Sequence, residues 1–172
     1  YIPAREDLDS GEVDNLADPQ RVGIERMSPG EVFVIDARGV TNAGTMGNIL
    51  ATRIQQKGGV GIVTDGAYRD SPAIREIGIA AYAAAMNAHT NKTVHHPSEI
   101  QVPVACGGVA VFPGDIIVGD SEGVVVVPAH LADEVAEAAE AQELKEQFII
   151  ERIEAGASLV GNYPPDTETL AE

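Results

Sequence analysis

The chain has 172 residues, of which 44% are hydrophobic, so it can bury one sizeable core, and a single compact domain over residues 1–172 is expected. Aromatic residues make up 4% and tryptophan is absent, so Val, Ile, Leu and Ala must fill that core, which favours an α/β or α+β class. The formal net charge of -16 argues against direct nucleic-acid binding, because a polyanion would be repelled across most of the surface.

The first elements alternate between strand and helix. Residues 5–20 are acidic, poor in large apolar side chains and interrupted by Gly and Pro, which is typical of a loop. The apolar run at 31–36 is bounded by turn residues and predicts a buried strand. A loop of small residues at 37–47 follows, and residues 48–57 place apolar side chains at helical spacing before a glycine pair.

The next part repeats this alternation. Residues 60–64 predict a second buried strand, and Asp65-Gly66 is expected to turn the chain. Ser71-Pro72 provides a suitable N-cap and first position for a short helix, and residues 79–85 predict a third strand.

The second half has a different pattern. Between residues 102 and 128, valine-rich runs are separated by tight turns, which predicts strands that pair locally. Residues 129–155 carry apolar side chains along one stripe and predict a long amphipathic helix. The polar tail, 156–172, is expected to lie on the surface or to reach a neighbouring subunit. These patterns together favour a mixed sheet with helices on its faces.

Cysteine content and hydropathy indicate the compartment. Cys106 is the only cysteine, which excludes an intrachain disulfide and a cysteine-based metal cluster. No apolar run approaches the length of about 20 residues that a membrane-spanning helix needs, and no signal sequence opens the chain. A cytoplasmic protein without membrane contact is therefore expected. The start at Tyr1 rather than Met predicts that a further segment precedes it.

Two segments can carry chemistry, because each follows a predicted buried strand. Residues 44–50 join a strand to a helix through two glycines, so N–H groups at the helix start can hold an anion, although a tight turn alone can also need such glycines. Arg69 and Asp70 follow the second strand at the same sheet edge, where ligands bind. Their side chains are expected to point in different directions, one toward a carboxylate and one toward a hard cation. A structural ion pair or a capped helix start is the alternative.

The segment GNILATRIQQKGGVGIVTDGAYRDSPAI, followed by PVACGGVAVFPGDIIVGDSEGVVVVP, resembles the RraA-like family, and the resemblance extends over residues 31–165. This family includes 4-hydroxy-4-methyl-2-oxoglutarate aldolases and regulators of ribonuclease activity. The resemblance implies a swivelling β/β/α domain with a mixed central sheet and a long C-terminal helix. It also implies assembly into homotrimers or hexamers with active sites between subunits, and family members usually have a further N-terminal segment.

The resemblance also implies the roles of individual residues. Arg69 matches the arginine that contacts the keto acid and is assigned a catalytic role, and Asp70 matches the direct ligand of Mg²⁺ or Mn²⁺. The substrate carboxylate would be held by backbone amides at the helix start, those of Gly47, Asn48, Ile49 and Leu50.

Two positions depart from the aldolase pattern of the family. Ala73 stands three positions after Asp70, where the aldolases have an acidic residue, and Asn48 stands where some of them have one. An Asn side chain cannot take a proton at neutral pH. These departures therefore affect aldol cleavage more than the binding of a metal and a 2-oxo acid.

The predicted function is a divalent-metal-dependent lyase that cleaves a carbon–carbon bond in a small 2-oxo acid. It would act as a pyruvate-forming aldolase, as an oxaloacetate decarboxylase, or as both, since the two reactions give the same pyruvate enolate. The alternative is a non-catalytic regulator that inhibits a ribonuclease by binding it through an acidic surface. A methyltransferase is disfavoured, because no glycine-rich nucleotide loop is followed by an acidic ribose ligand.

Other polar residues are assigned structural roles. The histidines lack a recognisable zinc-ligand spacing and are expected at the surface or an interface, at positions 89, 95 and 96. Acidic residues between the later strands are expected to serve turns, namely Asp115, Asp120 and Glu122. Cys106 lies in an apolar context and is expected to be a buried structural thiol.

Overall fold

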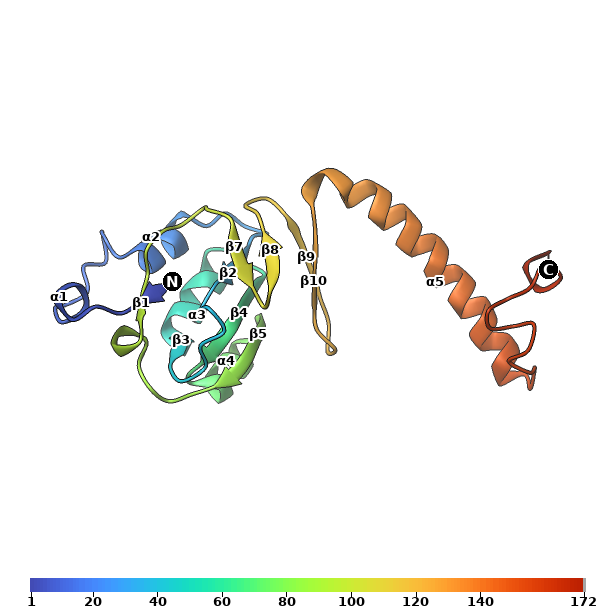
Figure 1. Ribbon diagram of the computed structural model, residues 1–172, viewed down its shortest axis with the longest axis horizontal. Coiled ribbons are helices and arrows are strands. Elements are labelled where there is room, and N and C mark those ends of the chain that lie inside the picture. The colour runs from blue at the N-terminus through green and yellow to red at the C-terminus, as the bar shows by residue number, and fades with distance from the viewer. Residues whose placement is uncertain (172) are drawn as a thin grey trace. The chain divides into compact units, whose positions relative to one another are not determined.

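The computed structural model describes residues 1–171, and its contacts divide the chain into two compact units, Tyr1–Val126 and Val127–Glu172 (Figure 1). A single domain over 1–172 stays a prediction. Among the described residues, no helix combines the length and the apolar character needed to cross a bilayer.

A four-stranded parallel sheet forms the centre of the first unit. Its central strand β4 (Gly61–Tyr68) pairs on one side with β5 (Ala80–Met86). Along its other side it pairs first with β2 (Val32–Ile35) and then with β3 (Gly44–Met46). Because β3 pairs with the last residues of β4, the carboxyl ends of these two strands lie together.

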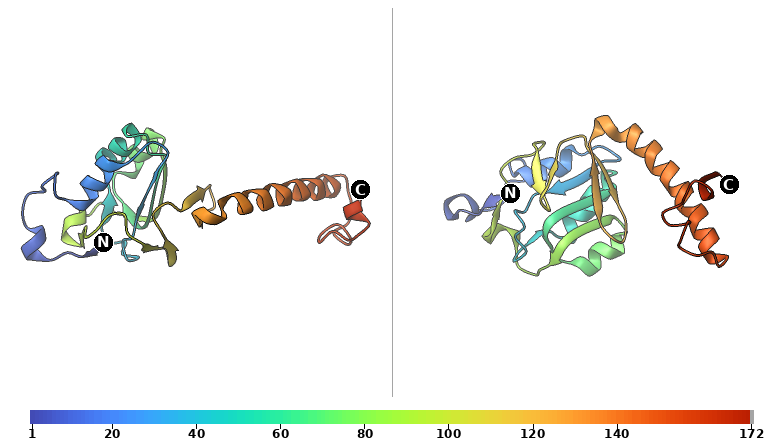
Figure 2. Two further views of the ribbon diagram at one scale, coloured as in Figure 1. Left: turned by 90° about the horizontal axis from the view of Figure 1, so that it is seen from above. Right: turned by 45° about the vertical axis from the view of Figure 1, so that its right-hand side comes forward.

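Three helices lie on one side of this sheet, as Figure 2 shows: α2 (Pro19–Arg26), α3 (Asn48–Gln56) and α4 (Ser71–Ile77). Their apolar side chains pack against the sheet. The buried core consists of Ile24, Met27, Ile35, Met46, Ala51, Ile54, Ile62, Tyr68 and Ile74. The predicted helix at 48–57 and the predicted strands at 31–36 and 79–85 are thus confirmed within a residue or two at their ends.

Ile54 of α3 is fully buried in this core. The change Ile54→Ala is expected to lower the free energy of unfolding by about 2–5 kcal/mol, because apolar burial is lost and a cavity remains. Urea denaturation followed by far-ultraviolet circular dichroism measures this loss. Leu16→Ala is the control, since Leu16 is 89% exposed and its loss should stay within about 0.5 kcal/mol. Equal losses at the two positions would contradict the assigned core.

Short strands complete the first unit. An antiparallel pair is formed by β7 (Val104–Cys106) and β8 (Val109–Val111), and another by β1 (Ile2–Pro3) and β6 (His95–His96). Strand β9 (Ile116–Gly119) pairs with β10 (Val124–Val127). The prediction of a β-rich second half is confirmed, and parallel and antiparallel pairs occupy separate sheets.

Two of the acidic residues between these strands, Asp115 and Asp120, serve turns, as expected. The Asp120 carboxylate accepts hydrogen bonds from the backbone N–H groups of Glu122 and Gly123. The Asp115 carboxylate accepts one from the N–H of Phe112. Such bonds stabilise tight turns locally and need no ligand.

The second unit contains the predicted long helix. The 3₁₀ turn η2 (Ala129–Leu131) leads into this helix, α5 (Ala132–Glu154). A further 3₁₀ turn, η3 (Thr169–Ala171), lies near the end of the unit. Arg152 donates to the side-chain oxygen of Asn162 at 2.7 Å, so the following segment folds back along the end of α5. Glu172, part of the predicted tail, lies outside the described residues.

Three local predictions are wrong, and the first two concern residues 5–20 and Asp65-Gly66. Residues 5–20 are not all loop, because α1 (Glu6–Asp9) lies within them and α2 starts at Pro19, where the Asp18 side chain accepts the N–H of Arg21. Asp65-Gly66 does not turn the chain, because β4 continues through it. The glycine is needed for close packing, since a Cβ on Gly66 would lie 2.5 Å from the Cβ of Ala37.

The segment 37–47 is also more ordered than a loop, because it contains β3. Asp65 holds its beginning, since the carboxylate accepts the N–H groups of Ala37 at 2.7 Å and Gly39 at 2.8 Å. The connection from β2 to β3 is thus fixed against β4. The segment that leads into β3 and the start of α3 is thereby held in position.

Candidate functional site

The two predicted segments meet at the carboxyl ends of β3 and β4. The N–H of Arg69 donates to the carbonyl of Met46 at 2.9 Å. This approach requires glycine at position 44, because a Cβ there would lie 2.8 Å from the Arg69 nitrogen. The prediction that the strand ends lie at one edge of the sheet is confirmed.

The start of α3 presents backbone N–H groups at this edge. Gly47 is its N-cap and supplies no side-chain hydrogen bond. The first helical bond runs from the N–H of Ala51 to the carbonyl of Gly47 at 3.1 Å. The N–H groups of Asn48, Ile49 and Leu50 therefore have no acceptor within the helix, and the helix dipole adds partial positive charge beside them. This is the geometry of an anion-binding helix start.

Arg69 and Asp70 converge on the same point. Their Nε and Oδ2 atoms are 3.4 Å apart, and both side chains are about half exposed. A Cβ on Gly47 would lie 2.9 Å from Arg69 Nε and 2.8 Å from Asp70 Oδ2. The expectation that the two side chains point in different directions is therefore wrong. The two side chains converge because Asp70 has the left-handed backbone conformation, with φ of 58°, which turns its side chain back toward that of Arg69.

The Asp70 carboxylate is not used to cap α4. The expected N-cap was Ser71, but Asp70 holds that position and makes no side-chain capping bond. The capped-helix alternative therefore does not account for this carboxylate. Its recorded partner is the Arg69 guanidinium.

The number of possible metal ligands limits the kind of metal site that can form here. Over residues 1–171, no cluster of three His, Cys, Asp or Glu side chains could hold a metal ion. Mg²⁺ typically keeps several waters and takes one or two carboxylates together with substrate oxygens. Asp70 therefore fits a cation shared with a bound ligand, and does not fit a closed site made by this chain alone.

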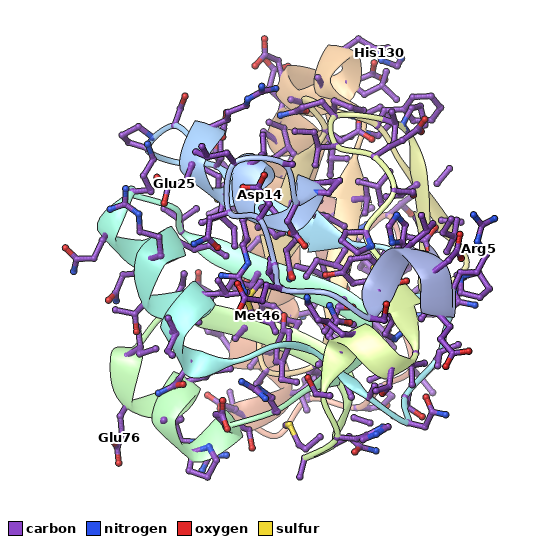
Figure 3. All side chains as sticks on the ribbon, turned by 90° about the vertical axis from the view of Figure 1, so that its left-hand side faces the viewer. Arg5, Asp14, Glu25, Met46, Glu76 and His130 are labelled. Atoms are coloured by element: carbon purple, nitrogen blue, oxygen red, sulfur yellow. The ribbon has the colours of Figure 1, made fainter. Side chains whose placement is uncertain are left out.

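A pocket of about 650 Å³ lies beside this cluster. Of the predicted site residues, Gly47, Ile49, Leu50 and Arg69 line it. Asn48 and Asp70 do not, and Asp70 is linked to the pocket through its contact with Arg69. Figure 3 looks onto this side of the first unit, where Asp14 and Met46 are labelled and both line the pocket.

Sequence reasoning missed a second group of residues that line this pocket, some of them within the segment 5–20 that was predicted to be a loop. It includes Asp9, Asp14, Asp18, Gln20, Arg21, Lys92 and His96. Gln20 is buried and donates from its side chain to the carbonyl of Thr45 at 2.8 Å, which fixes α2 beside β3. The Asp18-Pro19 pair was the available signal, since it is an N-cap followed by a first-turn proline.

Asp9 and His96 face each other in this group, with Oδ1 and Nδ1 2.9 Å apart. Burial raises the pKa of the Asp9 carboxyl, but hydrogen bonds from the Arg5 N–H and from His96, together with the nearby Lys92 charge, outweigh it. The net result holds that pKa below its usual value. Asp9 is therefore ionised beside the imidazole at neutral pH.

His95 is not at the surface, contrary to expectation. It is fully buried, its ring stacks on Tyr1 with centroids 5.2 Å apart, and its Nδ1 lies 3.2 Å from the Arg38 guanidinium. Burial, reinforced by the Arg38 charge, lowers the pKa of His95 to about 4. His95 is thus a neutral core histidine.

Cys106 is buried, as expected for a structural thiol. Burial, with a further contribution from the Asp65 charge, raises the pKa of the Cys106 thiol to about 11. The thiolate, which is the nucleophilic form, is therefore scarce at neutral pH.

Fold and site together define an α/β protein with a candidate anion and cation site at the carboxyl ends of parallel strands. The chain belongs to the RraA-like family, described as Aldolase/RraA, which it matches over residues 11–126. This confirms the resemblance seen in the sequence.

Relatives carry two kinds of name. The chain is 33% identical over 120 residues to a protein of Halalkalibacterium halodurans named "Putative 4-hydroxy-4-methyl-2-oxoglutarate aldolase", covering 70% of this chain and 57% of that protein. It also resembles the structure of Streptomyces coelicolor RraAS2, described as an unusual member of the RNase ES inhibitor RraA protein family. That match has a TM-score of 0.77 at 35% identity and covers 88% of this chain and 73% of the other.

A third relative is the RNA-processing inhibitor RraA from Thermus, with a TM-score of 0.54 at 29% identity, covering 64% of this chain and 68% of the other. The RraA-like α/β fold is thereby established, with its parallel and antiparallel strands and long C-terminal helix. The chain spans little more than half the length of two curated relatives that it matches, 57% of one and 54% of the other, and 22% of a third.

Proposed function

We propose that this chain binds a small 2-oxo acid together with Mg²⁺ or Mn²⁺ and cleaves a carbon–carbon bond in it, with pyruvate as a product. The observation that carries the proposal is the convergence of Arg69, Asp70 and the start of α3 on Gly47. The Arg69 guanidinium and the uncapped N–H groups can bind the carboxylate of a 2-oxo acid, and the Asp70 carboxylate can bind a cation. Aldol cleavage and oxaloacetate decarboxylation share one enolate, so the same site serves both.

Binding begins with the substrate carboxylate. The N–H groups at the start of α3 receive it, and the planar guanidinium of Arg69 offers paired donors to its oxygens. Ile49, Leu50 and Met46 line the same pocket and add an apolar wall that reduces competition from water. The substrate is thereby oriented with its keto group toward Arg69 and Asp70.

Cleavage places negative charge on the former keto oxygen. A cation held by Asp70 would supply Lewis-acid polarisation of that oxygen. Arg69 adds a fixed positive charge beside it, and such preorganised charge lowers the barrier because it acts where charge develops. Asn48 and Ala73 supply no carboxylate, so proton transfer must come from another residue.

A coupled pyruvate assay tests the proposal directly. Oxaloacetate and 4-hydroxy-4-methyl-2-oxoglutarate are supplied with Mg²⁺, with Mn²⁺ or with a chelator. Metal-dependent pyruvate formation above the metal-only rate is the expected result. Absence of turnover of either acid, together with absence of 2-oxo acid binding, would refute the proposal.

Glycine at position 47 is expected to be necessary for ligand binding. The change Gly47→Ala places a methyl group against Arg69 and Asp70, and such overpacking costs about 1–3 kcal/mol, or about 5- to 150-fold in affinity if it falls on the ligand site. Calorimetric titration with oxalate and Mn²⁺ measures the loss. Gly11→Ala is the matched control, because nothing lies within 4 Å of a Cβ there. Equal affinities for the two variants would argue against a site at Gly47.

A second candidate function is inhibition of a ribonuclease by binding. It is favoured by the net charge of -16 and by the inhibitor names of two structural relatives. An acidic surface docks onto basic partners through interactions that salt weakens. This function predicts a ribonuclease complex at low salt that dissociates at high salt and persists in Arg69→Ala. No such complex at low salt would remove it.

Assembly into a homotrimer or hexamer also stays a prediction, with active sites between subunits. Sedimentation velocity measures the state in solution. If a neighbouring subunit completes the site, 2-oxo acid cleavage should fall on dilution as the assembly dissociates. Full activity in a monomer would exclude this arrangement.

A further inference from the structure

The Asp9–His96 pair is held inside the candidate pocket. Asp9 Oδ1 is 2.9 Å from His96 Nδ1, and Asp9 Oδ2 accepts the N–H of Arg5 at 2.9 Å. The two side chains are 11% and 26% exposed, unlike the outer ion pairs of the chain. Both residues line the pocket that Arg69 also lines. The carboxylate is thus fixed through both oxygens, and the imidazole is fixed through one nitrogen.

This contact determines which nitrogen of His96 can react. An ionised carboxylate only accepts hydrogen bonds, so Nδ1 carries the hydrogen that points at Asp9. In the neutral ring the lone pair then resides on Nε2. A carboxylate that holds an imidazole in this tautomer is the arrangement found in general-base histidines.

Other groups of the pocket are less suited to carry a proton. The Glu12 side chain lines the pocket but is exposed, and no hydrogen bond from the described residues fixes its carboxylate. Arg69 does not lose its proton in proteins. The Asp18 carboxylate accepts the N–H of Arg21, and that of Asp14 accepts the N–H of Leu16, so both serve local backbone. The Lys92 ammonium contacts the carbonyl of Gly11 at 3.3 Å. His96 therefore combines a fixed orientation with a basic atom left for the ligand.

We propose that His96, oriented by Asp9, is the proton carrier of this site. The inference rests on the function proposed above. In aldol cleavage, His96 Nε2 takes the proton of the substrate hydroxyl as the carbon–carbon bond breaks. The hydroxyl carbon becomes a carbonyl, and the electrons of the broken bond form the pyruvate enolate.

The same ring then completes the reaction. The imidazolium returns its proton to C3 of the enolate, which gives pyruvate and restores neutral His96. Protons and electrons balance without a further reactant. In oxaloacetate decarboxylation carbon dioxide leaves without a proton, so only the delivery to C3 is needed, and water restores the imidazolium.

Exchange of the pyruvate methyl protons in D₂O tests this role apart from bond cleavage. Wild-type protein with Mn²⁺ or Mg²⁺ should exchange them, because His96 can remove a C3 proton from bound pyruvate and return deuterium. His96→Ala is expected to slow both exchange and aldol cleavage by about 100- to 10,000-fold, the usual contribution of a general acid–base group. Pyruvate affinity, measured by calorimetry, should be retained.

Two further readouts separate proton transfer from a structural role. Added imidazole should restore part of the exchange in His96→Ala, because the free base can enter the vacated space. Asp9→Asn should slow exchange while retaining pyruvate binding, since the ring loses the charge that orients it. His130→Gln is the control, because His130 does not line the pocket and should match wild type.

The outcomes are distinct. Wild-type exchange that persists in His96→Ala, or a slow His96→Ala variant that folds, binds pyruvate and does not respond to imidazole, would overturn the role of His96 and leave the proposed function standing. Wild-type protein that neither binds nor exchanges pyruvate would overturn both.

Discussion

Arg69→Ala is expected to lower kcat/KM for 2-oxo acid cleavage by about 100- to 1000-fold, the loss seen when one preorganised charge-stabilising donor is removed from an active site. The guanidinium lies beside Gly47 and the start of α3, where the substrate carboxylate and the developing enolate would both be. Most of the loss should appear in kcat, because the negative charge on the keto oxygen is largest in the transition state. Steady-state kinetics with oxaloacetate measures it.

Arg69→Lys extends this test, because lysine keeps the charge but not the fork of donors. Its activity should lie between those of wild type and Arg69→Ala. Arg53→Ala is the matched control, since Arg53 forms an exposed ion pair with Glu25 at 2.7 Å and does not line the pocket. A surface pair contributes about 0–1 kcal/mol to stability, so this variant should be fully active. Wild-type kinetics in Arg69→Ala would contradict the assigned role.

Asp70→Asn is expected to weaken Mn²⁺ binding by at least about 100-fold, because even residues behind a metal ligand cost about 10- to 100-fold when they are changed. Asparagine keeps the size of the side chain but removes the negative charge that a hard cation requires. The variant should stay folded, since the Asp70 carboxylate makes no capping bond to α4. Electron paramagnetic resonance of free Mn²⁺ measures the affinity.

The control for this variant is Asp133→Asn, in the first turn of α5. It makes the same chemical change at a position outside the candidate site. Mn²⁺ affinity should be that of wild type. Equal affinity in Asp70→Asn and Asp133→Asn would place any metal site elsewhere.

Much of the fold could be predicted from the sequence, because burial leaves regular traces. Apolar runs at 31–36 and 79–85 are typical of strands, and these runs form β2 and the partly exposed β5. The helix start at Asn48 was predicted from its spacing and glycines, and it supplies the uncapped N–H groups of the candidate site. Local sequence patterns were enough to predict these strands and this helix, because the apolar spacing within each segment indicates its structure.

Two of the errors, at Gly66 and at His95, share a physical cause, which is contact between distant segments. Gly66 lies within β4 and is in close contact with Ala37, whereas the local pattern of Asp65-Gly66 indicates only a turn. His95 is buried through Tyr1 and Arg38, both far away in sequence. The local sequence around a residue does not indicate which distant residues it will contact.

The site was predicted in part for the same reason. Strand ends placed Gly47, Arg69 and Asp70 together, but the left-handed conformation of Asp70 decided that the two charged side chains converge. The Asp9–His96 pair joins residues 87 positions apart. It becomes visible only when α1 and β6 are placed in the fold.

The most direct test of the central claim is the coupling between Mn²⁺ and oxalate, a dicarboxylate that resembles the pyruvate enolate. One shared site predicts that oxalate tightens Mn²⁺ binding to wild-type protein, and by reciprocity that Mn²⁺ tightens oxalate. The coupling should vanish in Arg69→Ala and in Asp70→Asn and persist in Arg53→Ala. Mn²⁺ binding that is independent of oxalate in wild-type protein would contradict a common site for the acid and the metal between Gly44 and Asp70.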